Sequence, residues 1–231
     1  WMTAGKGVQH CEMFPLLNKD QDNPLELFQI WLNLPKVKKL TAPHFAMLWS
    51  DKIPSFVTSD SNGLSTQVKV LAGNIGVIKA PDPAPNSWAA DPGNEVAIWL
   101  IRLEAGATWH LPPASAVANR SLYFYSGTSI KIAGDNFTTH QAIELGADQA
   151  VVLENGNSES WLLLLQGKPI NEPVAQYGPF VMNTQDEIQQ AMAEYQTKRA
   201  NDLRESERQE KLRAKEAFMK MLADTLPSLS D

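Results

Sequence analysis

The chain has 231 residues, of which 43% are hydrophobic and 20% charged, and its formal net charge is −6. This composition can fill a substantial core and excludes a disordered protein. A negative chain has no field that attracts nucleic acid or anionic lipid, so we expect no direct nucleic-acid partner. We expect no membrane span either, because the longest strongly apolar run, residues 161–165, is far too short to cross a bilayer.

The chain contains one cysteine, Cys11, so it cannot form an internal disulfide. A single thiol suits a reducing compartment, and we expect the protein in the cytoplasm. The first residue is Trp1 rather than methionine, and no signal peptide follows it. We therefore expect the natural start of the protein to lie further upstream.

Short apolar runs separated by turn residues recur from the start of the chain to about residue 165. Glycine and asparagine lie between many of these runs and supply the positive φ that tight hairpin turns require. This pattern favours a β-sandwich or β-barrel over an alternating α/β fold. In chain order, we expect strands at residues 28–34, 68–71, 77–78, 96–103, 122–125, 129–132, 150–153 and 161–165.

Two proline clusters interrupt these strands. Residues 79–86 include three prolines, which cannot continue the interior of a sheet. We expect a loop there between two halves of the fold. The second cluster, Leu111-Pro112-Pro113, predicts a loop at the rim of a barrel.

The sequence changes character at residues 184–187, Thr-Gln-Asp-Glu, which have the form of a capping box. We expect a helix to begin there, because an apolar stripe continues from Ile188 to Tyr195. A second apolar group near the end consists of Ala214, Ala217, Phe218, Met221 and Leu222. Two alternatives remain for this tail: a solvated helix, or a helix that docks on a protein partner.

Two stretches of the chain carry distinctive motifs. The first is Trp1-Met2-Thr3-Ala4-Gly5-Lys6-Gly7-Val8-Gln9-His10-Cys11-Glu12, with Gln29-Ile30-Trp31-Leu32-Asn33-Leu34-Pro35 further on. The second is Gly167-Lys168-Pro169-Ile170-Asn171-Glu172-Pro173-Val174, followed by Gly178-Pro179-Phe180-Val181-Met182-Asn183-Thr184. Both resemble the pirin family of the cupin superfamily, and the resemblance covers about residues 1–197.

The resemblance implies an all-β fold with two cupin-type double-stranded β-helix barrels in tandem, the first one partial, and a C-terminal α-helix. On this basis, residues 1–80 are expected to hold the remainder of the N-terminal barrel and a linker. Residues 81–183 would form the C-terminal cupin barrel, and residues 184–231 the helix and a charged tail.

A metal site is also implied by the resemblance. Pirins hold one metal ion in the N-terminal barrel with three histidines and a glutamate, which makes His10 and Glu12 two of the ligands here. Side chains at i and i+2 of a strand face the same side, so this pair would converge while Cys11 points away. The ion expected is iron(II) or another divalent first-row metal, which suits imidazole and carboxylate ligands. No catalytic residue is expected apart from these ligands.

The ligand set implied by the family is incomplete in this sequence. The upstream His-x-His element of the family has no counterpart here, so we expect the metal to be incompletely coordinated by this chain. The remaining histidines, His44, His110 and His140, form no such element. His110 lies where a metal-binding barrel carries its first histidines, but Leu111-Pro112 takes the place of a second ligand. We therefore expect a metal-free C-terminal barrel with His110 as a structural residue.

The resemblance leaves more than one function open. The first is a metal-dependent dioxygenase of the quercetin 2,3-dioxygenase type, an oxidoreductase acting on a flavonol-like molecule and O2. The second is a non-catalytic regulatory or interaction module, a transcription cofactor or regulator of a metabolic enzyme, that binds a protein through the C-terminal helix. A third is that the chain is a fragment of such a protein. A barrel without its first strands would expose strand edges and apolar faces, which predicts association.

Overall fold

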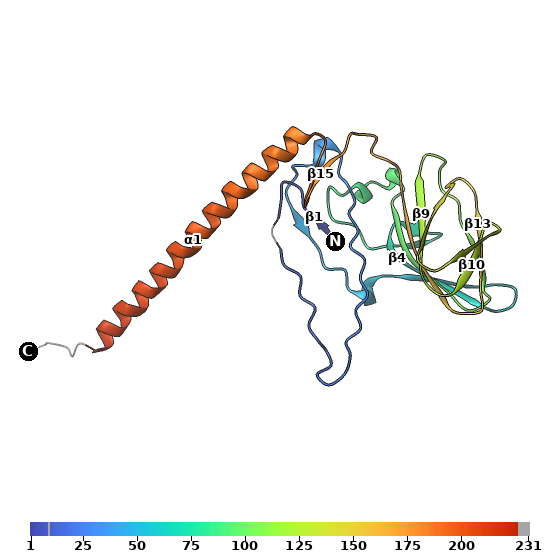
Figure 1. Ribbon diagram of the computed structural model, residues 1–231, viewed down its shortest axis with the longest axis horizontal. Helices are drawn as coiled ribbons and strands as arrows, with labels where there is room; N and C mark the ends of the chain where they lie inside the picture. The colour runs from blue at the N-terminus through green and yellow to red at the C-terminus, as the bar shows by residue number, and fades with distance from the viewer. Residues whose placement is uncertain (9, 226–231) are drawn as a thin grey trace, which may run out of the picture. The chain divides into compact units, whose positions relative to one another are not determined.

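The structure is a computed structural model that describes residues 1–8 and 10–225 (Figure 1). The chain divides into two compact units, Trp1–Glu172 and Pro173–Asp231. The described part of the first unit is built from antiparallel strands, and that of the second from a short hairpin and a long helix. The expectation of an all-β fold followed by a C-terminal helix is confirmed.

The larger sheet of the first unit is antiparallel, with the strand order β12-β9-β14-β7-β4-β3. Strand β14 therefore lies between two strands that come much earlier in the sequence. The members are β3 (Ser55–Ser59), β4 (Ser65–Ala72), β7 (Ala97–Leu103), β9 (Asn119–Ser126), β12 (Gln141–Leu145) and β14 (Ser160–Gly167).

A second antiparallel sheet has the order β11-β10-β13-β8. Its members are β8 (Thr108–Leu111), β10 (Ser129–Ile132), β11 (Asp135–Thr138) and β13 (Val151–Asn155). Figure 1 shows β10 and β13 on one side of the barrel, facing β4 and β9 on the other. The two sheets enclose the main core.

The core forms because alternate side chains of each strand point inward. Residues with 0% exposure come from both sheets: Val68, Val70, Ile101, Leu103, Leu111, Leu122, Phe124, Leu153, Leu162 and Leu164. The outer face of the larger sheet carries a second apolar cluster around Ile98 and Leu163. Apolar cover on both faces of the sheet explains why residues 161–165 form an unbroken apolar run instead of an alternating one.

Several expected strands are confirmed. Those at residues 68–71, 96–103, 122–125, 129–132, 150–153 and 161–165 correspond to β4, β7, β9, β10, β13 and β14, with boundaries that differ by a few residues. The expected strand at 77–78 corresponds to β6 (Ile78–Lys79), which pairs with β5 (Asn74–Ile75). The loops expected from the proline clusters follow directly after β6 and β8.

The strand expected at residues 28–34 is wrong. This stretch has no regular structure, and most of its side chains are exposed. A strand needs a partner for its backbone groups, and no strand of the described residues pairs with it. In this part of the chain the only ladder that the structure describes joins β1 (Met2–Thr3) to β2 (His44–Phe45).

The larger sheet draws strands from both sides of residue 80. Strand β4 pairs with β7 along most of its length, so residues 55–72 share a sheet with strands of the C-terminal barrel. The expected division at residue 80 remains a prediction. Short 3-10 helices connect the strands: η1 (Lys36–Lys38), η2 (Ser50–Lys52), η3 (Trp88–Ala90) and η4 (Pro92–Asn94).

The second unit contains the hairpin of β15 (Ala175–Tyr177) and β16 (Phe180–Met182), followed by α1 (Gln185–Thr225). The expected capping box is confirmed. Thr184 N donates to Glu187 Oε2 at 3.0 Å, and Glu187 N donates to Thr184 Oγ1 at 3.2 Å. The Phe180 and Tyr195 rings meet edge to face, with centroids 5.8 Å apart. Within the described residues, no helix has the length and apolar character needed to cross a membrane.

Candidate functional site

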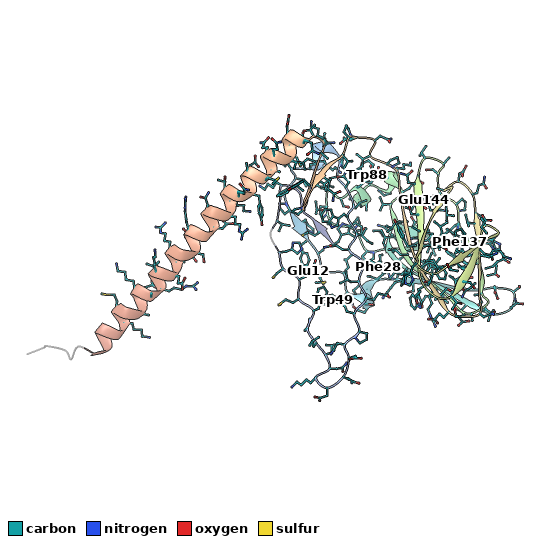
Figure 2. All side chains as sticks on the ribbon, in the orientation of Figure 1. Glu12, Phe28, Trp49, Trp88, Phe137 and Glu144 are labelled. Carbon is teal, nitrogen blue, oxygen red and sulfur yellow. The ribbon has the colours of Figure 1, made fainter. Side chains whose placement is uncertain are left out.

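His10 and Glu12, the expected metal ligands, lie on an irregular segment of the first unit. Their side chains are 46% and 56% exposed, and His10 Nε2 is 3.5 Å from Glu12 Oε1. Figure 2 shows Glu12 on this segment, away from Phe137 in the barrel. The two side chains lie close to each other, but the strand that was expected to turn them into a barrel is not formed, and both are about half exposed. The segment that contains His10 and Glu12, like residues 28–34, pairs with no strand of the described residues.

The distance between the two side chains can be compared with the distance between two ligands of one metal ion. Ligand atoms about 2.0–2.2 Å from one ion are separated by roughly 3 Å at a right angle and by more at wider angles. The observed 3.5 Å is close to this range. Within residues 1–8 and 10–225, no group of three or more His, Cys, Asp or Glu side chains could hold a metal ion. The role of His10 and Glu12 as metal ligands remains a prediction.

The other histidines lie on other segments of the first unit. His110 is exposed on β8 opposite Val152, with its side chain on the face away from the core. His140 adopts a left-handed backbone with φ 65, and its amide donates to Phe124 O at 2.7 Å. His44 is exposed on β2. The expectation that the C-terminal barrel carries no metal stays a prediction.

A polar network around Glu95 covers one end of the C-terminal barrel. Glu95 Oε1 accepts from Lys168 Nζ at 2.8 Å, and Oε2 accepts from the Ser115 amide at 3.0 Å. The hydrogen bond from Lys168 is the main reason why the pKa of the Glu95 carboxyl falls to about 2 from an ordinary value of 4.5. The network ties the loop after β8 and the chain after β14 to the start of β7.

Arg120 is buried at the same end of the barrel. Its side chain shares the inward face of β9 with Leu122 and Phe124, and the residue is 2% exposed. Arg120 Nε and Nη2 both donate to Gln166 Oε1, at 2.9 and 2.5 Å, and Gln166 Nε2 donates to Glu95 O at 3.1 Å. The sequence analysis missed Arg120, although its spacing of two and four residues from two core positions was a usable signal.

An aromatic groove lies on the outer face of the larger sheet. Its volume is about 490 Å³, within the range typical of sites for small molecules. The irregular segment 28–31 forms one wall, and side chains of β9, β12 and β14 contribute the rest. The rings of Phe28 and Tyr125 meet edge to face at 4.8 Å. Burial, with a smaller contribution from Glu26, raises the pKa of the Tyr125 hydroxyl from an ordinary value of 10 to about 12.

Comparison with known proteins places the chain among the cupins. The pirin C-terminal cupin domain matches residues 98–201. Pirin from Mus musculus is 33% identical over 201 residues, which is 84% of this chain and 62% of that protein. A pirin-like protein from Solanum lycopersicum is 33% identical over 204 residues, or 85% and 62% of the two chains. The chain thus spans less than two thirds of the length of these relatives.

The same fold occurs in solved structures. A crystal structure of quercetin 2,3-dioxygenase from Acinetobacter baumannii superimposes with a TM-score of 0.60 and 23% identity, covering 71% of this chain and 53% of that one. A second quercetin 2,3-dioxygenase structure from the same organism gives a TM-score of 0.56 and 16% identity, covering 71% and 49%. These similarities confirm the cupin β-barrel fold.

Proposed function

This chain belongs to the pirin family of cupin proteins. We propose that it functions as a metal-dependent dioxygenase that acts on flavonol-like molecules, with His10 and Glu12 as two metal ligands. The observation that carries the proposal is the approach of His10 Nε2 and Glu12 Oε1 to 3.5 Å. The name quercetin 2,3-dioxygenase, borne by proteins of the same fold, supports the substrate class.

The chemistry proposed needs little from the protein besides ligation and access. A bound iron(II) or other divalent first-row ion would supply open coordination positions for O2 and substrate. The His10 imidazole would bind through Nε2 and the Glu12 carboxylate through Oε1, the two atoms that approach each other here. Both side chains are about half exposed, so small molecules reach them. The aromatic groove offers ring contacts that suit a planar substrate.

The test measures bound metal and O2 uptake together. We expect His10→Ala and Glu12→Ala each to lower metal affinity at least tenfold, measured by plasma mass spectrometry after dialysis against defined metal concentrations. Quercetin-dependent O2 consumption should fall in parallel. His110→Ala is the matched control, since His110 is exposed on the C-terminal barrel and should change neither quantity. Full metal retention in both ligand variants, or a metal-loaded protein without quercetin-dependent O2 uptake, contradicts the proposal.

A second candidate, the non-catalytic interaction module, is favoured by exposed apolar side chains in the irregular segment. Met13, Leu16 and Leu17 are 84%, 77% and 89% exposed. Contiguous apolar surface of this kind is typical of a surface that binds another protein. The helix proposed to bind a partner is present as α1, where Leu212 and Met219 are more than half exposed. The side chains of Phe218, Met221 and Leu222 lie outside the described residues.

The cytoplasmic location remains a prediction.

A further inference from the structure

The guanidinium of Arg120 has hydrogen-bond donors without acceptors. Nε and Nη2 share one acceptor, Gln166 Oε1, whereas Nη1 is buried and has no hydrogen-bond partner. Buried donors in folded proteins almost always have a partner, and one without a partner loses the hydration it had in the unfolded chain. Arg120 Nη1 can therefore donate a hydrogen bond to at least one further acceptor.

The charge of Arg120 is also uncompensated. No carboxylate of the described residues forms an ion pair with it, and the nearby Glu95 carboxylate is already held by Lys168 and the Ser115 amide. Burial lowers the pKa of the Arg120 guanidinium, and no acidic group contributes an opposing effect. An arginine nevertheless stays protonated in proteins, so a full positive charge is buried at this end of the barrel. Such a charge is costly to bury unless a counter-charge accompanies it.

A second donor without a partner belongs to the same end of the barrel. Trp99 is 4% exposed, and its Nε1 is buried with no acceptor. In the larger sheet, Gln166 of β14 pairs directly with Arg120 of β9. On the other side of β14, Trp99 of β7 pairs with Leu164 and is therefore a diagonal neighbour of Gln166. Diagonal neighbours on one face lie about 7–8 Å apart, within reach of long and aromatic side chains. The two unpartnered donors thus lie on β9 and β7, on either side of β14.

We propose that a small monovalent anion, a halide or a one-carbon carboxylate such as formate, binds at Arg120 inside this end of the C-terminal barrel. A bridging water would satisfy the donors but would leave the positive charge uncompensated. A metal cation is excluded by repulsion from the guanidinium. The anion supplies both an acceptor and a counter-charge, and it makes Arg120 the centre of a site separate from His10 and Glu12.

The solution test measures thermal unfolding at constant ionic strength. Sodium gluconate, whose anion is too large for a packed barrel, is replaced stepwise by chloride, bromide or formate. A ligand that binds only the folded state raises the melting temperature, by about 3–6 °C at ten times Kd for a chain of this size. Comparison of the halide and formate series identifies which anion binds. Equal melting temperatures in all four salts would overturn the proposal.

Variants of the site separate it from general salt effects. Arg120→Met keeps a long apolar side chain and should abolish the anion dependence. Gln166→Glu places a fixed carboxylate beside the guanidinium and should abolish it as well. Lys131→Met removes an exposed charge from β10 and should leave the dependence intact. An anion response that survives Arg120→Met contradicts the site.

Crystals of the wild-type protein provide a readout that does not depend on any variant. After growth or soaking in sodium bromide, diffraction data collected above the bromine edge should show an anomalous peak at hydrogen-bond distance from Arg120 Nη1. If crystals soaked in bromide show no anomalous signal and crystals soaked in formate also show only an ordered water at that position, solvent alone satisfies the arginine and the proposal fails.

Discussion

Glu95 joins parts of the C-terminal barrel that are distant in the sequence. It accepts hydrogen bonds from Lys168 and Ser115, and its own backbone is left-handed, with φ 52 and ψ 33. A non-glycine residue in this region carries a modest conformational cost, which the surrounding bonds offset. Glu95 is therefore a point at which a single side chain holds the end of the barrel together.

We predict that Glu95→Gln lowers the free energy of unfolding by about 1–2 kcal/mol at pH 7, allowing for partial solvent screening. The folded pKa of Glu95 is about 2 and the ordinary value is 4.5. Its contribution is therefore fully present above about pH 4.5 and is lost as the pH falls toward 2. Urea unfolding at several pH values should show the difference between wild type and variant shrinking through this window.

The control for Glu95 is Glu154→Gln. Glu154 forms an exposed pair with Lys131, with 3.6 Å between Nζ and Oε2. Exposed pairs contribute little, so we expect a change within about 0.5 kcal/mol. If Glu95→Gln proves no more destabilising than this control, Glu95 does not hold the barrel end together.

The start of α1 shows how local sequence determines an element. The Thr184–Glu187 box was recognisable from four residues because its hydrogen bonds are made within one turn of helix. Glu187 Oε2 also accepts from the Asn183 amide at 2.9 Å. The carboxylate thus satisfies two backbone donors that precede the helix.

We predict that Glu187→Ala weakens the first turn of α1 by about 0.5–2 kcal/mol, because these backbone donors lose their acceptor. Amide hydrogen exchange should accelerate severalfold over residues 183–190 and stay unchanged in the barrel. Glu205→Ala, further along the helix, is the comparison and should leave the first turn unaffected. Unchanged exchange at 183–190 in Glu187→Ala would show that the box does not stabilise the helix start.

Elements fixed by contacts between distant residues were predicted less well. Strands β7 and β14 were predictable because burial imposes a continuous apolar sequence on them. Strands β8, β11 and β12 are short and include exposed polar residues, which left little pattern to detect. The stretch 28–34 has the pattern of a strand without a partner to pair with, and pairing is not encoded in local sequence.

The site residues also differ in how well the sequence predicted them, depending on whether the signal was local or came from distant contacts. His10 and Glu12 were predicted from a motif close in sequence, and their side chains do converge. Arg120 was not predicted as a site residue, because its significance depends on Gln166, 46 residues away, and on the absence of a carboxylate partner within the described part of the chain. The two-residue spacing from Leu122 indicates that Arg120 faces inward, but only the fold shows that it is buried with no carboxylate partner among the described residues.

For the whole molecule, the exposed apolar segment is the feature with the clearest consequence. We predict that the protein self-associates, and that Leu16→Asp combined with Leu17→Asp reduces this, since both side chains are more than three quarters exposed. Light scattering over a range of concentrations would measure the change in mass. Lys19→Asp alone changes the net charge by the same −2 and controls for added negative charge nearby. A wild-type protein that is monomeric at every concentration contradicts the prediction.

The position of β14 also bears on how the protein is made. Strand β14 is the last of the six strands of the larger sheet to be synthesised. Until Gly167 has left the ribosome, β9 can pair with β12 and β7 with β4, but the strand that joins these two pairs is missing. During translation, the apolar side chains of β7 and β9 therefore remain partly exposed in an intermediate whose sheet is not yet closed. Chains halted before this point should be strong clients of chaperones, and those halted after it should be able to close the barrel on the ribosome.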